Sequence, residues 1–164
     1  MSMPFEAGSR LTAAALDELA VQVLQLATDT TTTSTTPTSL LTGNVDASTT
    51  YWVDGILECV IGGTSTPPKI GFYGTATESA MSIGYSMFEE STSGESIYGG
   101  RLTAMSSNSA QTATFANGST VQVRFSGTVT FSGAGTFIIE AGDTTSGDHY
   151  TVKAGSGMIL IQQT

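Results

Sequence analysis

The residues of this chain that could perform acid–base or nucleophilic chemistry are few. His149 is the single histidine, and a serine hydrolase needs such a base beside its nucleophile. The triplets Gly133-Ala134-Gly135 and Gly155-Ser156-Gly157 stand between expected strands, where they are interpreted as hairpins. A nucleophile elbow or a phosphate-binding loop would instead lead into a helix. We therefore predict that the chain is not an enzyme and uses no cofactor.

Acidic side chains offer two further kinds of site. Asp143, Asp148 and His149 could surround a metal ion, because oxygen-rich loops suit calcium. Glu89 and Glu90 could form the carboxylate pair of a glycosidase. Adjacent residues of a strand point to opposite faces, which separates that pair. We expect a solvated loop in the first case and an exposed acidic loop in the second, and hence no metal site.

Charge and composition limit the partners. The chain has 164 residues, only 12% of them charged, and a formal net charge of −9. The five basic residues are scattered, so there is no positive stripe to neutralise phosphates, and nucleic acid is not an expected partner. An acidic surface also resists adsorption to anionic membranes. The lone Cys59 excludes an internal disulfide and is expected to be buried.

The N-terminal residues carry no targeting signal that the sequence reveals. Residues 1–6 lack the basic and apolar regions of a signal peptide. No apolar run approaches the roughly 18 residues of a membrane helix. We expect the chain to be made in the cytosol, wherever it is finally located.

One helix is predicted, over residues 12–27. Its apolar side chains recur at spacings of three and four, and Thr12 is a suitable N-cap. About four turns are unstable alone in water, so this face must dock. Its own body, sister helices and a host protein all remain possible docking partners. The predicted anchoring face consists of Leu16, Leu19, Val23 and Leu26.

A Thr-rich tract follows the predicted helix. β-Branched threonines disfavour a helix and Pro37 stops it, so residues 29–39 are predicted to form an extended arm. Three segments result: an N-terminal segment with the anchoring helix (1–28), the arm (29–39) and a β domain (40–164).

The β domain is predicted from alternating apolar residues and turn signals. Asn117-Gly118 is typical of a type I′ hairpin. Eight to ten short strands indicate a sandwich, jelly roll or barrel. The expected strands cover residues 50–60, 69–73, 81–88, 97–104, 112–116, 120–126, 128–131, 136–141, 149–153 and 157–161.

Two of these strands are apolar on both faces. In the first, Tyr51, Val53, Leu57 and Cys59 suit the core, while the opposite face is also too apolar for plain solvent. In the last, Met158 and Leu160 point one way and two isoleucines the other. A strand that is apolar on both faces needs cover on both sides. We predict a subunit interface made of Trp52, Ile56, Val60, Ile159 and Ile161.

The sequence resembles small structural proteins of tailed bacteriophages. Their opening pattern is similar to Phe5-Glu6-Ala7-Gly8-Ser9-Arg10-Leu11-Thr12-Ala13-Ala14-Ala15-Leu16. The body resembles the trimeric jelly rolls of the tumour-necrosis-factor/C1q type in three motifs: Thr50-Tyr51-x-Val53-x-Gly55-x-Leu57, Gly135-Thr136-Phe137, and Val152-x-Ala154-Gly155-Ser156-x-Met158-x-Leu160. The stretch 75–100 departs from the pattern. The resemblance implies a mainly β, TNF-like jelly roll that trimerises about its closing strands.

The function predicted from these observations is structural. A trimeric capsid decoration or head-fibre protein, attached to the major capsid protein or another virion protein, is the first interpretation. A minor tail or tail-tip protein is the second. A carbohydrate- or receptor-binding module is the third, with Trp52, Tyr73, Tyr85 and Tyr98 as stacking platforms for a weak glycan contact.

Overall fold

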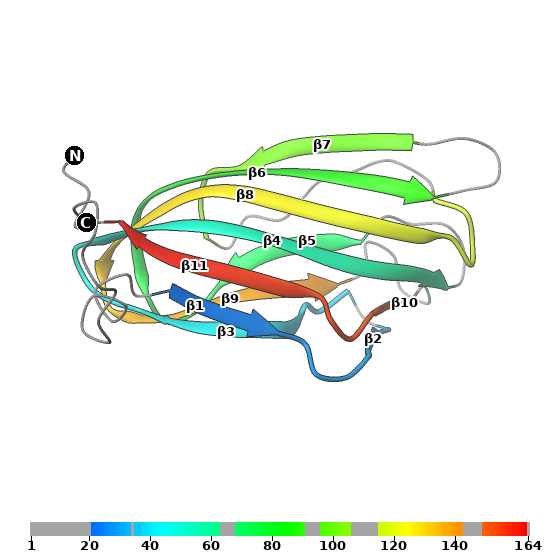
Figure 1. Ribbon diagram of the computed structural model, residues 1–164, viewed down its shortest axis with the longest axis horizontal. Coiled ribbons are helices and arrows are strands. Elements are labelled where there is room, and N and C mark those ends of the chain that lie inside the picture. Colours follow the sequence, from blue (N-terminus) through cyan, green and yellow to red (C-terminus); the bar gives the residue numbers. More distant parts are fainter. Residues whose placement is uncertain are drawn as a thin grey trace, which may run out of the picture.

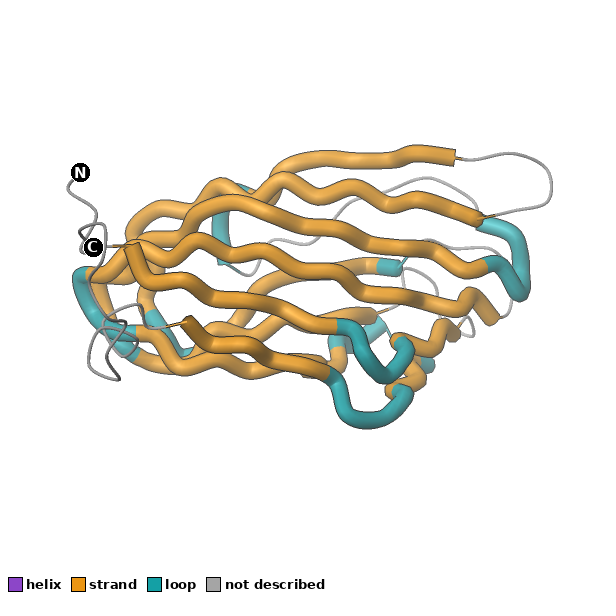
Figure 2. Tube along the Cα trace, in the orientation of Figure 1, coloured by secondary structure: helices purple, strands orange, loops and turns teal. Residues whose placement is uncertain are grey.

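The chain folds as a sandwich of two antiparallel β-sheets. The computed structural model describes residues 21–33, 35–62, 68–90, 96–105, 115–142 and 149–163. The large sheet has the order β1-β11-β4-β8-β6-β7, with β10 also beside β4 and β2 beside β10, and the small sheet has the order β3-β9-β5 (Figure 1). No described residue is helical (Figure 2). The strands are β1 Val21–Gln25, β2 Thr30–Thr32, β3 Thr38–Val45, β4 Thr49–Gly62, β5 Lys69–Tyr73, β6 Thr77–Glu90, β7 Ser96–Leu102, β8 Thr120–Gly133, β9 Gly135–Gly142, β10 His149–Val152 and β11 Gly157–Gln163.

The strand pairs are nested along the chain. β1 pairs with β11, β2 with β10, β3 with β9 and β4 with β8. The register is nearly constant along these four strand pairs: Val21 is opposite Ile161, Thr32 opposite Tyr150, and Thr49 opposite Phe131. The first half of the chain thus runs antiparallel to the second half. The β3–β9 pair lies in the small sheet and the other three pairs lie in the large sheet, so the paired segments fold into two layers.

The core lies between the sheets and is built from the inward positions of each strand. The predicted inner face of β4 is confirmed, because Tyr51, Val53, Leu57 and Cys59 are all at most 1% exposed. Burial of each large apolar side chain contributes about 1.5–3 kcal/mol. Aromatic rings from both sheets fill the centre in stacked and edge-to-face contacts. These pairs are Phe72–Phe137, Phe72–Phe125, Phe131–Phe137 and Tyr51–Phe131.

The prediction of a helix over residues 12–27 is wrong for its second half. Residues Val21–Gln25 form β1, an edge strand of the large sheet. The β-branched Val21 and Val23 suit a strand, and backbone bonds to β11 outweigh a weak helical period. Leu26 follows β1 as a half-buried residue packed against the core. Leu16 and Leu19 lie outside the described residues.

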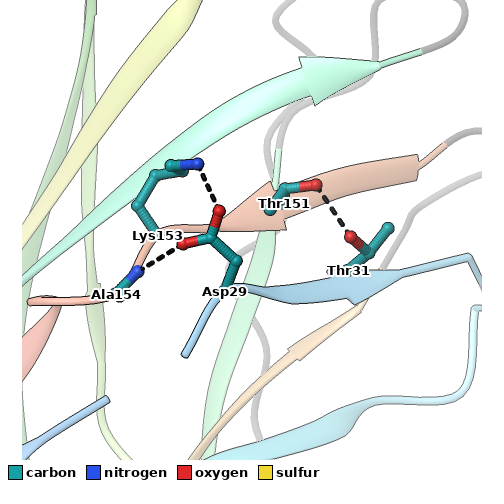
Figure 3. Close-up of polar contacts among 5 residues, drawn as sticks. All are labelled: Asp29, Thr31, Thr151, Lys153 and Ala154. Atoms are coloured by element: carbon teal, nitrogen blue, oxygen red, sulfur yellow. Dashed lines mark hydrogen bonds and ion pairs between the residues drawn. The ribbon is translucent and has the colours of Figure 1, made fainter. Parts of the chain in front are cut away.

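The Thr-rich tract supplies a short strand to the large sheet. Thr30–Thr32 is β2, and the Thr31 and Thr151 hydroxyls are hydrogen-bonded at 2.8 Å between β2 and β10 (Figure 3). Just before β2, the Asp29 carboxylate contacts Lys153 Nζ and accepts a 2.9 Å hydrogen bond from the Ala154 N–H. The tract is therefore held against the sheet. The division of the chain into three segments stays a prediction.

The two predicted glycine hairpins are wrong, although both triplets do lie between strands. β8 and β9, on either side of Ala134, belong to different sheets, and β10 and β11 both pair with β4. β8 also runs unbroken through Gly127, where two strands were expected. A Cβ at Gly127 would lie 2.0 Å from the Ser82 carbonyl oxygen, so glycine here reflects close backbone approach and not a turn.

The turn at Asn117-Gly118 exists but is not of type I′. The Ser119 N–H donates to the Ala116 carbonyl at 3.1 Å, and Gly118 has a φ of 80°. Asn117 has no positive φ, which a type I′ turn would require, so the geometry is that of a type II turn. Phe115 and Ala116 precede it outside any strand, and 112–114, the rest of that predicted strand, lie outside the described residues.

Candidate functional site: the outer face of the large sheet

Three neighbouring strands carry apolar side chains on the outside of the large sheet. Their register places Val21, Ile161 and Trp52 in one row across β1, β11 and β4. The next row contains Val23 and Ile159. These strands lie side by side in Figure 1. We call Val21, Val23, Trp52, Ile56, Ile159 and Ile161 the apolar half of the face.

The apolar half is unusually exposed. Val21 is 47%, Val23 71%, Trp52 39% and Ile56 38% exposed. These four are all the exposed large hydrophobic side chains among the described residues, and every one of them lies on this face. Single exposed apolar residues need no explanation, but a contiguous set marks an interaction site. The predicted interface residues Val60, Ile159 and Ile161 are half-buried on the same face.

The adjoining strands are lined with small residues and form a groove. The outward positions of β8, β6 and β7 include Ser126, Gly84, Ser86 and Gly99, which follow one another across the sheet in two rows. The groove has a volume of about 820 Å³ and is lined on one side by Val23, Ile56 and Ile159 of the apolar half and on the other by small residues of β6 and β8. We call the surface of β8, β6 and β7 the groove half.

Two opposite charges lie at the boundary between the halves. Asp54 on β4 is opposite Ser126, and Arg124 on β8 is opposite Ile56; both charged side chains are exposed and line the groove. The Arg124 guanidinium lies 6.0 Å from the centre of the Phe88 ring. Among the described residues, no ion pair involves Asp54 or Arg124.

Of the residues considered for catalysis, His149 and Ser156 are described, and they lie at different places along β4. His149 is exposed at the start of β10, opposite Gly62. Ser156 is 3% exposed, and its Oγ accepts a 3.0 Å hydrogen bond from the Glu58 N–H. This serine fixes a turn to β4 and is shielded from a substrate. Asp143 and Asp148 lie outside the described residues.

The prediction of an exposed acidic loop at residues 89 and 90 is wrong. Both residues belong to β6, and Glu89 is 7% exposed. Its Oε1 accepts a 2.7 Å hydrogen bond from the Ala116 N–H, which explains a buried carboxylate that is not part of any pair. Across the described ranges, no three His, Cys, Asp or Glu side chains gather to hold a metal ion.

Cys59 has the buried position expected of it. Its side chain faces the core of the sandwich at 0% exposure. Burial away from water, followed by the nearby Glu58 carboxylate, raises the pKa of the thiol to about 12. Since the thiolate is the reactive form, this cysteine is inert in the folded chain.

The four aromatic residues predicted to stack on a glycan differ in their exposure. Tyr85 is 8% exposed, and Tyr98 is half-buried in edge-to-face contact with Phe115. Tyr73 is half-buried at the end of β5. Trp52 alone of the four is an exposed ring. In the part of the chain that the structure describes, there is no helix with the length and apolar character needed to span a bilayer.

Comparisons with known proteins do not assign this chain to a family. No protein-family model and no curated protein matches the chain. Among solved structures, a chain from the "Structure of infectious bursal disease virus Gt strain" matches at 12% identity and a TM-score of 0.28, over 99% of this chain and 47% of that one. A chain from the Gx strain matches at 12% identity and a TM-score of 0.26, over 87% and 41%. The chain thus spans less than half of each, and scores this low carry no argument about function.

Sequence reasoning found part of this face and missed the rest. It identified Trp52, Ile56, Ile159 and Ile161, because β4 and β11 are long enough to show alternation on both faces. It missed Val21 and assigned Val23 to a helix. The available signal was Val21-x-Val23, two β-branched residues at alternate positions shortly before the Thr-rich tract.

Proposed function

We propose that this chain is a non-enzymatic structural subunit of a virion, which assembles as a homotrimer through the outer face of the large sheet. The observation that carries the proposal is the gathering of every exposed large hydrophobic side chain of the described residues on that face. Covering each one stabilises an assembly by up to about 1.5–3 kcal/mol.

The nested strand pairs support the finer part of this proposal. A jelly roll is a double antiparallel sheet, which a long ribbon forms when it folds over on itself. The pairs β1–β11, β2–β10, β3–β9 and β4–β8 have this arrangement. It agrees with the TNF-like jelly roll that the motifs of the sequence suggest. The assignment to a tailed bacteriophage depends on the resemblance of residues 5–16, which lie outside the described residues.

The placement of the subunit has two alternatives. A capsid decoration or head-fibre protein, bound to the major capsid protein, is the form we propose first, and a minor tail or tail-tip protein is the second. Quantitative mass spectrometry of purified particles that encode the chain separates them. A copy number in the hundreds, matching the symmetry of a shell, supports decoration. A few copies support a tail position, and absence from particles contradicts a virion role.

The assembly is tested with the full-length chain. Sedimentation equilibrium is expected to give three times the 16.9 kDa mass of one chain. Replacing both Trp52 and Ile56 by serine removes exposed apolar contacts without touching the core, and should shift the chain to monomers. Thr42→Ser, an equally exposed change on the small sheet, is the control. A monomeric wild type would contradict the proposal.

A glycan-binding function is the second candidate, and it depends on Trp52. Exposed tryptophan rings stack on sugar faces, and this ring lies on the same sheet face as the groove, two residues from Asp54 in its lining. Glycan-array binding that is lost in Trp52→Ala, in a chain that remains monomeric, would favour this function over assembly.

A further inference from the structure

The two halves of the outer face have complementary shapes. The apolar half, on β1, β11 and β4, presents protruding valine, isoleucine and tryptophan side chains. The groove half, on β8, β6 and β7, presents small serine and glycine residues in two rows. The groove, with a volume of about 820 Å³, runs across both halves. The small residues of one copy leave room for the large apolar side chains of another. A surface that carries both a projection and its receptacle is suited to bind a copy of itself.

The charge at the edge of the apolar half is opposite in sign to the charge at the edge of the groove half. Asp54 lies at the edge of the apolar half and Arg124 at the edge of the groove half. In the described part of the chain, both are without an ion pair. If the apolar half of one copy covers the groove half of another, an aspartate approaches an arginine. Every copy supplies one of each, and the exposed Glu58 on β4 and Arg101 on β7 add an acid to the apolar half and a base to the groove half. The contact therefore brings together charges of opposite sign although each chain carries a formal net charge of −9.

We propose that the groove is occupied by a second copy of this chain, whose apolar half packs into it while its Asp54 forms an ion pair with Arg124 of the first copy. This inference rests on the proposed function, because it names the two surfaces that join the subunits. Contact between two different patches is heterologous and closes into a ring when the rotation per subunit allows. The ion pair sets the register, since a displaced or inverted arrangement would leave both charges desolvated and unpaired.

A charge-exchange experiment tests the pair. Asp54→Arg and Arg124→Asp each place like charges in contact, and each should raise the Kd of self-association of the full-length chain by about tenfold or more. The double variant restores opposite charges in exchanged positions, and its Kd should return to within about threefold of wild type. Both positions are exposed, so the fold is expected to survive, and circular dichroism checks this. A double variant no better than the singles would overturn the inference.

A second variant tests the groove without altering charge. A Cβ at Gly84 would approach nothing closer than the Ser126 and Gly100 carbonyl oxygens, at 3.8 and 4.0 Å. Gly84→Val therefore fits the isolated chain but fills the groove, and should raise the Kd by about tenfold, as expected for overpacking a close interface. Thr42→Val adds the same side chain to the small sheet, outside the proposed contact, and should leave the Kd unchanged.

The outcomes distinguish this inference from the proposed function. If wild type forms a trimer that the Trp52 and Ile56 changes dissociate, but Gly84→Val and the charge exchange have no effect, the function stands and the inference is wrong. A monomeric wild type overturns both. A monomer that binds glycans at the groove would assign the groove to a different occupant.

Discussion

The side-chain amide of Gln22 forms a pair of hydrogen bonds with the backbone of Asn44. Gln22 Nε2 donates to the Asn44 carbonyl oxygen at 2.5 Å, and Gln22 Oε1 accepts from the Asn44 N–H at 3.1 Å. Gln22 belongs to β1 and Asn44 to β3, so one side chain joins the edges of the two sheets. This contact turns Val21 and Val23 outward, because neighbouring residues of a strand face opposite sides.

Gln22→Met keeps the size of the side chain and removes both hydrogen bonds. The backbone groups of Asn44 are left to solvent, so the cost should be about 1 kcal/mol, confined mainly to β1. Hydrogen exchange of the β1 amides measures it and should speed up several-fold. Gln163→Met, at the exposed end of β11, is the matched control. Unchanged exchange in β1 would show that the amide pair contributes nothing.

Asp29 makes the contact between the β1–β2 and β10–β11 connections sensitive to acid. The Ala154 N–H, and then Lys153, stabilise its carboxylate and lower its pKa from the model-compound value of 3.8 (Figure 3). The folded pKa lies below the unfolded one, so the stabilisation is fully present above about pH 4 and is lost as pH falls through the folded pKa. An NMR titration should give Asp29 a pKa below 3.8. Asp29→Asn should abolish this acid dependence of the Ala154 amide shift; persistence of the shift would contradict the assignment.

Cys59 should report on unfolding. Its raised pKa, about 12, leaves almost no thiolate at pH 8. A thiol reagent should therefore react with the native chain only at the rate of unfolding, and at once in denaturant. Cys59→Ala supplies the blank. Rapid stoichiometric labelling of the native chain would show that β4 is accessible at this position.

Two glycines on opposite faces of the large sheet should respond differently to the same change. A Cβ at Gly55 would lie 2.3 Å from the Phe125 ring and 2.6 Å from the Gly157 carbonyl oxygen, whereas a Cβ at Gly84 would make only ordinary van der Waals contacts, at 3.8 Å and beyond. Gly55→Ala overpacks the core and should lower the free energy of unfolding by about 1–3 kcal/mol, while Gly84→Ala should be neutral. Urea unfolding of both variants measures the difference. Equal stabilities would mean that the sandwich relaxes easily around Phe125.

Long strands could be predicted because the alternation of apolar residues within one strand is a signal that needs no distant partner. β4 has 14 residues and its inner face alternates without a break, so its core residues follow from periodicity alone. β5 was predicted to the residue. β1 and β2 have five and three residues, too few for a period to decide between helix and strand. Glu89 was misplaced for a related reason, because its partner Ala116 lies on a distant turn.

The sequence by itself determined an all-β body, the buried face of β4 and the two-sided apolar character of β4 and β11. Only the tertiary structure decided that Val21–Gln25 is a strand, since its partner β11 lies at the other end of the chain. It alone also placed Gly84 and Ser86 beside Ser126 and Ile56 to form a groove. Alternation fixes which way a side chain points, whereas strand order, which depends on pairing between distant segments, fixes what lies next to it.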